Sequence, residues 1–329
     1  MRTRMLKGIL NRNVRHSLDE TLEIDADLSE RERMSHAGLR AAYVGILGRE
    51  PDAAGFANNL RFFEDAEFED AMTVVLGTFL KGPEAAPILM SHLVNRMRPE
   101  VSKHRIANLP TFRHVVSLGW NCMPSSMFKR HGLKRYSLPF DWIFSGPDVV
   151  DHMIRDEFRE LMSPRNHLHV PVEKRPSPNL GLCDHRFYLE NFGVKDMFNH
   201  YDPSIPEDRG YLGRCVYRFK KLYEVNEPKL YVATVKDEKY SPQVASSLND
   251  AIHANSKHAK LLVVRLGTAP TGSLTPIVTS EKHGANFEVV RFLGLGNLAD
   301  VIFPNMLDEA AFMWMILRHD IQLSNTIPS

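Results

Sequence analysis

Cys122 is the residue of this sequence whose setting best suits chemistry. It lies in SLGWNCMPSSMFKRHG, residues 117–132, where a β-branched run ends and Gly119 turns the chain. Pro124 then suits the first turn of a helix, and Gly132 suits its end. Cys122 is therefore expected at, or one residue before, a helix N-terminus, where free amides and the helix dipole stabilise an anion.

A thiolate in such a place has its pKa lowered from about 8.5 to between about 3.5 and 7.5. Cys122 is thus a candidate nucleophile, although a free cysteine at the end of an element is more often a packing residue. A tyrosine-phosphatase loop is excluded, because it requires arginine six residues after the cysteine and Phe128 stands there.

Other residues that could hold a metal or a cofactor are less well spaced. His167 and His169 lie two residues apart, as on one side of a strand, and Cys183 and His185 form a second such pair. A zinc site needs three or four ligands at regular spacing, so we expect no metal. The segment LGLGNLA, residues 293–299, formally matches a dinucleotide-binding loop. No complete βαβ unit follows it, so a turn and no cofactor are expected.

The bulk composition narrows the classes of function. The 329 residues include 41 basic and 40 acidic ones, which gives no bias toward nucleic acid or an anionic membrane. The three cysteines cannot all pair and contain no C-x-x-C motif, which favours a reducing, cytoplasmic location. Cys183 is expected in a loop and Cys215 in helix packing. No apolar run approaches the ~18 residues of a membrane span.

The pattern of apolar residues divides the chain into four parts. Residues 1–34 form a basic tail without the apolar core of a secretory signal. A helical module is expected over 35–98, in which Asp52 suits a helix N-cap, and a polar linker over 99–111.

The remainder, residues 112–329, reads as an α/β layered domain with a mostly parallel sheet. HVVSLG, KLYVATV, KLLVVRLGT, FEVVRFLGL and DVIFP are expected strands, and SPQVASSLNDAIHANSK and LDEAAFMWMILRHD are expected helices. Apolar strands that alternate with helices are typical of a parallel sheet covered on both faces.

Two resemblances to known families follow from these motifs. YVGILGREPDAAGFANNL and the later FLKGPE resemble a short bacterial helical domain of unknown function with an LGRxPDxxG core, found beside carbohydrate- and surface-related domains. The plainer interpretation is that Arg49, Pro51, Asp52 and Gly55 only build a turn between helices.

VSLGWNC, YSLPFDWIFS, FNHYDP and YLGRCVYRF stand in the order of a bacterial family named putative papain-like cysteine peptidase, itself of unknown function. This second resemblance extends over residues 113–320.

The second resemblance implies roles for particular residues. Cys122 would be the nucleophile and His200 the base that takes its proton. Asp202, separated from His200 by one inserted residue, or Asp141 of the PFDW motif would orient the imidazole. Asn121 or the Cys122 amide would donate to an oxyanion.

The chain departs from the family pattern where paired arginines are usual. Cys215 replaces the second of them, which leaves Arg214 and Arg218 four residues apart on one helix face. We expect these arginines to hold Asp141 or Asp202 in an ion pair, with binding of an anionic ligand as the alternative. Trp120 and Trp142 would wall a pocket or pack in the core.

The sequence thus predicts a cysteine hydrolase that attacks an acyl or amide carbon of an unknown substrate, such as a peptide or glycoconjugate. A thiol-dependent acyltransferase uses the same chemistry with another acceptor. The alternative from a different class is a non-catalytic binding or assembly protein associated with surface-polysaccharide machinery. No nucleic acid is an expected partner, and the sequence leaves the oligomeric state open.

Overall fold

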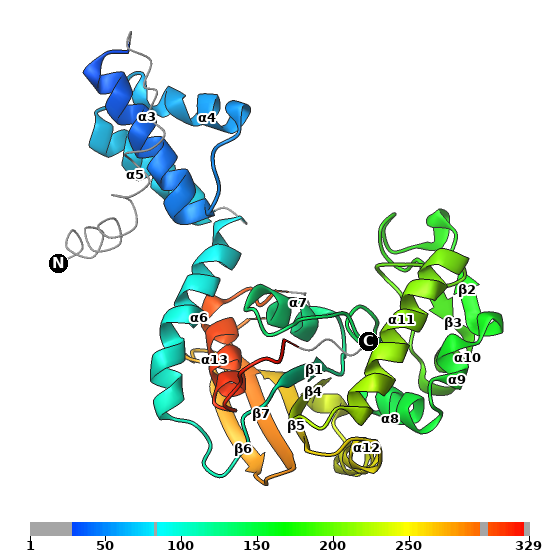
Figure 1. Cartoon of the computed structure of the whole chain (residues 1–329). Coiled ribbons are helices and arrows are strands. Elements are labelled where there is room, and N and C mark those ends of the chain that lie inside the picture. Colours follow the sequence, from blue (N-terminus) through cyan, green and yellow to red (C-terminus); the bar gives the residue numbers. More distant parts are fainter. Residues whose placement is uncertain (1–27, 82–83, 297–301, 326–329) are drawn as a thin grey trace. The chain divides into compact units, whose positions relative to one another are not determined.

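The computed structural model describes residues 28–81, 84–296 and 302–325 (Figure 1). The chain divides into two compact units between His92 and Leu93. The first unit contains α3 (Glu30–Ala42), a π-helical turn (Tyr43–Leu47), α4 (Ala53–Leu60), a 3-10 turn (Arg61–Phe63) and α5 (Phe68–Lys81). Helix α6 (Ala85–Lys103) crosses the boundary, so the first five residues of the expected linker are helical.

The LGRxPDxxG motif of the first unit forms the turn between two helices. Asp52 is the N-cap of α4 and accepts a hydrogen bond from the Gly55 amide at 2.8 Å. Arg49 forms ion pairs with Asp52 and Glu84 and lies over the ring of Tyr43, 5.2 Å from its centroid. These contacts support the interpretation that the motif builds a helix junction. The expected Gly82-Pro83 break lies outside the described residues.

The second unit carries the strands. Its elements in chain order are β1 (His114–Ser117), α7 (Met123–Arg130), α8 (Pro147–Arg155), α9 (Arg159–Met162), β2 (His167–His169), β3 (Cys183–His185), α10 (Arg186–Phe192), α11 (Pro206–Glu224), β4 (Lys229–Lys236), α12 (Pro242–Asn255), β5 (Ala259–Thr268), β6 (Ile277–Lys282), β7 (Phe287–Gly294) and α13 (Met306–Leu317). Three 3-10 turns cover Pro164–Asn166, Val172–Lys174 and Asp237–Lys239.

The main sheet has the order β1-β4-β5-β7-β6. The first four strands are parallel, and β6 pairs antiparallel with β7 at one edge. Both faces are buried, as expected for parallel strands. Leu261 and Val263 of β5 belong to the core cluster that includes residues of α8 and α12. On the other face, Phe292 of β7 contacts Phe312 of α13 with ring centroids 5.9 Å apart. Figure 1 shows α12 and α13 on opposite sides of the sheet.

The fold class is the one that the sequence predicts, a mostly parallel α/β sheet with an N-terminal helical region. One expected strand was wrong in its described part, because Ile302–Pro304 of DVIFP lie outside any strand. The place beside β7 is already taken by β6, whose six residues are all exposed and therefore lack an apolar pattern. The two-stranded sheet of β2 and β3 was not expected.

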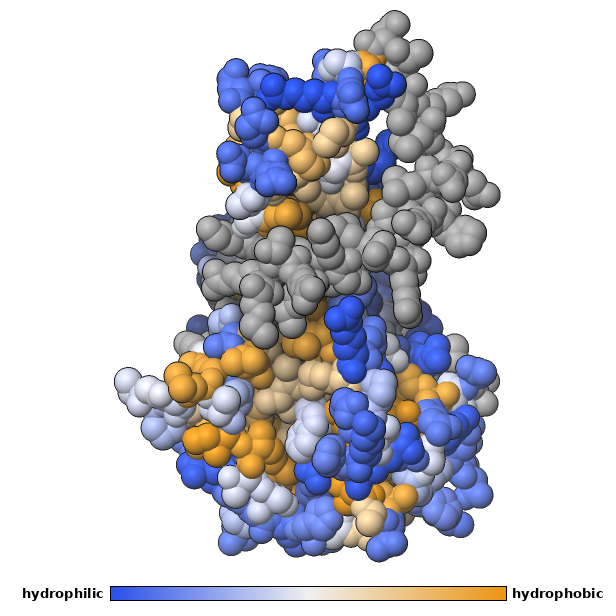
Figure 2. Space-filling view, turned by 90° about the vertical axis from the view of Figure 1, so that its left-hand side faces the viewer, coloured by the Kyte–Doolittle hydropathy of each residue, from blue (hydrophilic) through white to orange (hydrophobic). Residues whose placement is uncertain are grey.

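On the face shown in Figure 2, hydrophobic residues are interrupted by hydrophilic ones. Among the described helices, none has the length and hydropathy required to cross a bilayer.

Candidate functional site

The turn that carries Cys122 has an unusual backbone. After β1 ends at Ser117, the chain passes through Gly119 and Trp120, whose φ angles are 85° and 99°. A side chain at Gly119 would collide with the Ser145 hydroxyl, so this position requires glycine. A bulky residue such as Trp120 rarely adopts a positive φ. Strain of this kind persists only where the surrounding structure enforces it, and it is frequent at functional sites.

Cys122 is the N-cap of α7, as the sequence predicts. Its thiol is partly exposed. The Asn121 Oδ1 atom caps the helix by accepting a hydrogen bond from the Met123 amide at 2.9 Å. Burial raises the pKa of the Cys122 thiol, and only the contact with its own amide acts in the opposite direction. The expected lowering of this pKa by the helix N-terminus is therefore not found, and the resting group is a thiol.

His200 is an exposed residue that lies beside Trp142. The imidazole meets the indole edge-on, with ring centroids 5.2 Å apart. Partial burial lowers the pKa of His200, so the ring is neutral at pH 7 and can accept a proton. Among the hydrogen bonds of the described residues, none joins His200 to Asp141 or Asp202, the two acids predicted to orient it. The indole of Trp142 is the group that contacts it instead.

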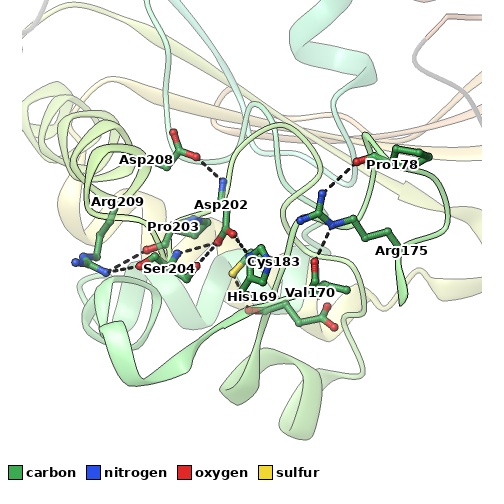
Figure 3. A network of polar contacts seen from close by, with 11 residues as sticks. His169, Val170, Arg175, Pro178, Cys183, Asp202, Pro203, Ser204, Asp208 and Arg209 are labelled. Carbon is green, nitrogen blue, oxygen red and sulfur yellow. Dashed lines mark hydrogen bonds and ion pairs between the residues drawn. The ribbon is translucent and has the colours of Figure 1, made fainter. Parts of the chain in front are cut away.

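Asp202 is bound to a different histidine (Figure 3). Its Oδ2 atom lies 2.5 Å from Nδ1 of His169, and its Oδ1 atom accepts hydrogen bonds from the amide and hydroxyl of Ser204. Burial would raise the pKa of Asp202, but the hydrogen bonds from Ser204 and His169 outweigh it and lower that pKa. Asp202 is thus already engaged on the side of the segment that faces His169.

The buried thiol of Cys183 completes this group (Figure 3). It donates to the Asp184 carbonyl at 3.3 Å and lies near Asp202, so the structure contains a Cys-His-Asp group that the sequence did not predict. Burial, together with the charge of Asp202, raises the pKa of Cys183 to about 12. A fully buried thiol with so high a pKa is unsuited to be a nucleophile.

Asp141 is buried against a lysine that the sequence analysis missed. The Lys134 ammonium forms an ion pair with Asp141 and a hydrogen bond with the Ser125 hydroxyl of α7. Burial raises the pKa of Asp141 and lowers that of Lys134, whereas the contact between them acts in the opposite direction on each. Lys134 also lies over the indole of Trp142, 4.9 Å from the ring centroid. Through Lys134 this pair therefore contacts both α7 and Trp142.

Arg214 and Arg218 do not form the expected ion pairs with Asp141 or Asp202. Arg218 donates to the Ser137 carbonyl at 2.5 Å. The Arg214 side chain is exposed. The described ion pairs assign Lys134 to Asp141 and His169 to Asp202 in their place.

A ladder of extended segments relates Cys122 to the two histidines. Residue 120 pairs with 145, and 143 pairs with 198, so residues 143–145 separate the turn before Cys122 from the segment that leads to His200. Two strand spacings correspond to about 10 Å between backbones. His169 is two further spacings away, because 198 pairs with 183 and 183 with 169. By this count the His200 segment is nearer to the turn before Cys122 than the strand of His169 is.

The histidines of β2 and β3 and the cysteine of β3 are not arranged as a metal site in the described structure. Within the described ranges, no three His, Cys, Asp or Glu side chains are grouped so that they could hold a metal ion. His167 and His185 face each other across the small sheet, and the Nε2 atom of each donates to a backbone carbonyl, that of Leu161 and that of Glu160 respectively. Burial lowers the pKa of His185 to about 4. These two histidines are therefore packing residues.

Comparison with known proteins supports the second resemblance. Residues 113–263 match the family model described as "Putative papain-like cysteine peptidase (DUF1796)". The matched segment contains Cys122, Asp141 and His200, and it ends within β5, short of the residue 320 to which the motifs were extended. No curated protein and no solved structure matches the chain.

Proposed function

We propose that the domain is a cysteine hydrolase in which Cys122 attacks an acyl or amide carbon and His200 is the general base. The observation that carries the proposal is the position of Cys122 at the start of α7, after the carboxyl end of β1. In open parallel sheets, ligands bind outside the carboxyl ends of the strands.

The protonation states define how the reaction would begin. The Cys122 pKa is raised and the His200 pKa is lowered, so at pH 7 the pair is a neutral thiol and a neutral imidazole. The imidazole accepts the thiol proton as sulfur bonds to the carbonyl carbon, and the imidazolium then returns that proton to the leaving amine or alkoxide. Water hydrolyses the resulting thioester with the same histidine as base. The Nδ2 group of Asn121 and the Cys122 amide would donate to the oxyanion.

Trp142 serves as the positioning residue for His200 in this proposal. Its ring contacts both the Lys134 ammonium and the imidazole, at centroid distances of 4.9 and 5.2 Å. An indole cannot accept a proton or stabilise an imidazolium as a carboxylate does. The base is therefore expected to act without a charged partner, as an imidazole that its lowered pKa keeps unprotonated at pH 7.

A thiol-dependent acyltransferase remains the closest alternative, since it differs only in the group that receives the acyl chain. The alternative from another class is a non-catalytic assembly protein. The raised pKa of the Cys122 thiol favours that alternative, because a thiol that never ionises is only a packing residue.

The test is the rate of Cys122 alkylation by iodoacetamide as a function of pH, followed by mass spectrometry of the Cys122 peptide. If His200 takes the thiol proton, the wild-type profile has a shoulder above the lowered pKa of His200 and below the raised pKa of Cys122, and the His200→Ala variant loses it. We expect the rate at pH 7 to fall about tenfold in that variant.

His169→Ala is the matched control, because it removes an equally accessible histidine that lies two strand spacings farther from the thiol. It should leave the shoulder unchanged. A wild-type profile with a single titration above pH 8.5, indifferent to His200, would overturn the hydrolase and support the assembly protein.

A further inference from the structure

A pocket of about 310 Å³ opens at the carboxyl ends of β1 and β4. Its walls come from the end of α10, the first turns of α8 and α12, and the strand ends. The lining residues that set its polarity and charge include Trp120, Asp148, Lys195, Val235, Lys239 and Tyr240.

The interior of this pocket is apolar on its deep side. Val235 of β4 and Val263 of β5 line it there, and Trp120 and Tyr240 contribute aromatic walls. Trp120 is held in place by the strained turn described above, with its carbonyl accepting a hydrogen bond from the Ser145 amide at 3.2 Å. The strain thus directs an aromatic side chain into the pocket two residues before Cys122.

The mouth of the pocket is positively charged. Lys195 and Lys239 line it, and the Lys236 ammonium lies 5.5 Å from the centroid of the Trp120 ring. In the described part of the chain, none of these three lysines is in an ion pair. Asp148, at the start of α8, is the acidic residue among the described lining.

The acid next to this lysine group is already neutralised. Asp237 forms ion pairs at 2.7 Å with both Arg265 and Arg291, and Arg265 also pairs with Glu281. A second acid, Glu238, is exposed between Lys236 and Lys239. The three lysines therefore exceed Asp148 and Glu238 by one positive charge, while Arg265 and Arg291 are balanced by Asp237 and Glu281. Cations that converge on a concave surface raise the local concentration of an anionic ligand.

We infer that this pocket binds an anionic group, a carboxylate or a phosphate, of the substrate whose acyl or amide carbon Cys122 attacks. The inference rests on the proposed function, which it deepens by giving the substrate class. Lys195 and Lys239 would contact the anion, and Trp120 would pack against the adjoining apolar part.

The experiment compares two alkylating reagents that differ in charge, iodoacetate and iodoacetamide, at Cys122 of the full chain. The measured quantity is the ratio of their rates, normalised to the ratio for free glutathione. In the Lys195→Gln/Lys239→Gln variant we expect the ratio to fall severalfold, because two positive charges that attract iodoacetate are lost. Added salt should reduce the wild-type ratio in the same direction.

Lys257→Gln is the matched control, because this exposed lysine lies before β5 at the opposite edge of the sheet. It should leave the ratio unchanged. Acetate and inorganic phosphate are then added at equal ionic strength, and the one that slows iodoacetate more identifies the anion.

The inference is overturned if the double variant keeps the wild-type ratio, or if neither anion slows iodoacetate. Either result leaves the dependence of alkylation on His200 intact, so the hydrolase would stand without the anion site. Conversely, a ratio that depends on the lysines with no dependence on His200 would remove the hydrolase and leave an anion-binding pocket.

Discussion

The two edges of the parallel sheet use charged residues in opposite ways. At the edge where the strands begin, here the amino edge, His114, Lys229, Lys260 and Glu288 are all less than 5% exposed. Lys260 and Glu288 form an ion pair at 3.0 Å, and His319 contacts the same carboxylate at 3.1 Å. Each charged group there has its partners inside the protein.

Lys229 shows the same pattern without a carboxylate. Its ammonium donates to the carbonyls of Val225 and Glu227 at 2.5 and 3.0 Å, and to that of Lys257 at 3.4 Å. Burial lowers the pKa of Lys229 to about 8. The lysine thus satisfies backbone carbonyls that would otherwise be buried without donors.

At the carboxyl edge Asp237 is also paired, with Arg265 and Arg291, but the reactive groups and the pocket lysines are more exposed and less engaged. Cys122 and His200 have pKa values shifted by partial burial alone or nearly so, and Lys195 and Lys239 point into a pocket. Buried, fully paired charges hold the fold, whereas accessible groups without protein partners are available to a ligand. The difference between the edges therefore locates the site better than any single residue does.

The largest change in stability that tests this comparison is expected at the amino edge. Glu288→Gln leaves the Lys260 ammonium buried beside a neutral amide, and we expect a loss of about 3 to 5 kcal/mol in the free energy of unfolding. The measurement is the midpoint of urea denaturation. Lys239→Gln at the carboxyl edge is the control and should change stability by less than about 0.5 kcal/mol. Equal losses at the two edges would contradict the comparison.

The same carboxylate predicts how stability depends on pH. Burial would raise the pKa of Glu288, but His319 and Lys260 outweigh it and lower that pKa to about 2. A group whose pKa is lowered on folding stabilises the protein above its unfolded value, near 4.5, and that contribution is lost as the pH falls toward 2. Wild type should lose more stability over this window than Glu288→Gln does. Parallel curves for the two proteins would show that Glu288 has no lowered pKa.

An intermediate effect is expected at the buried pair beneath the site. Asp141→Asn removes the carboxylate that holds Lys134, and we expect a loss of about 3 kcal/mol because the ammonium stays buried. Lys134 also contacts the first turn of α7 and the Trp142 ring, so the His200-dependent alkylation of Cys122 should fall as well. A variant that is destabilised but keeps normal alkylation at pH 7 would assign this pair to the fold alone.

The sequence was sufficient to predict the elements that carry their own local signal. Apolar runs identified β4, β5 and β7, and the glycine and proline around Cys122 placed it at the start of α7. Strand β6 could not be found this way, because its residues are all exposed and it pairs, among the described strands, with β7 alone. Three-residue strands such as β2 and β3 give too few positions for any period to be recognised.

The contacts within the site were less predictable, because they join residues far apart in the chain. His169 and Asp202 are 33 residues apart, and nothing in either neighbourhood indicates that they pair. The predicted direction of the Cys122 pKa shift was wrong for a related reason. A helix N-terminus can be read from local residues, but the burial that outweighs it depends on tertiary packing.

The smallest effect is expected at Trp142. Its indole is the ring that contacts the His200 imidazole in the described part of the chain. Trp142→Phe keeps an aromatic face but shortens the ring that spans Lys134 and His200. An aromatic contact of this kind contributes about 0.5 to 1.5 kcal/mol, so the alkylation rate of Cys122 at pH 7 should fall about threefold. The urea midpoint should move little, because Trp142 is only partly buried. Trp314→Phe, on α13, is the control for loss of an indole and should leave the rate unchanged. If Trp142→Phe lowers stability without changing the rate, the indole serves only in packing. His200 must then be positioned by the backbone of its own segment.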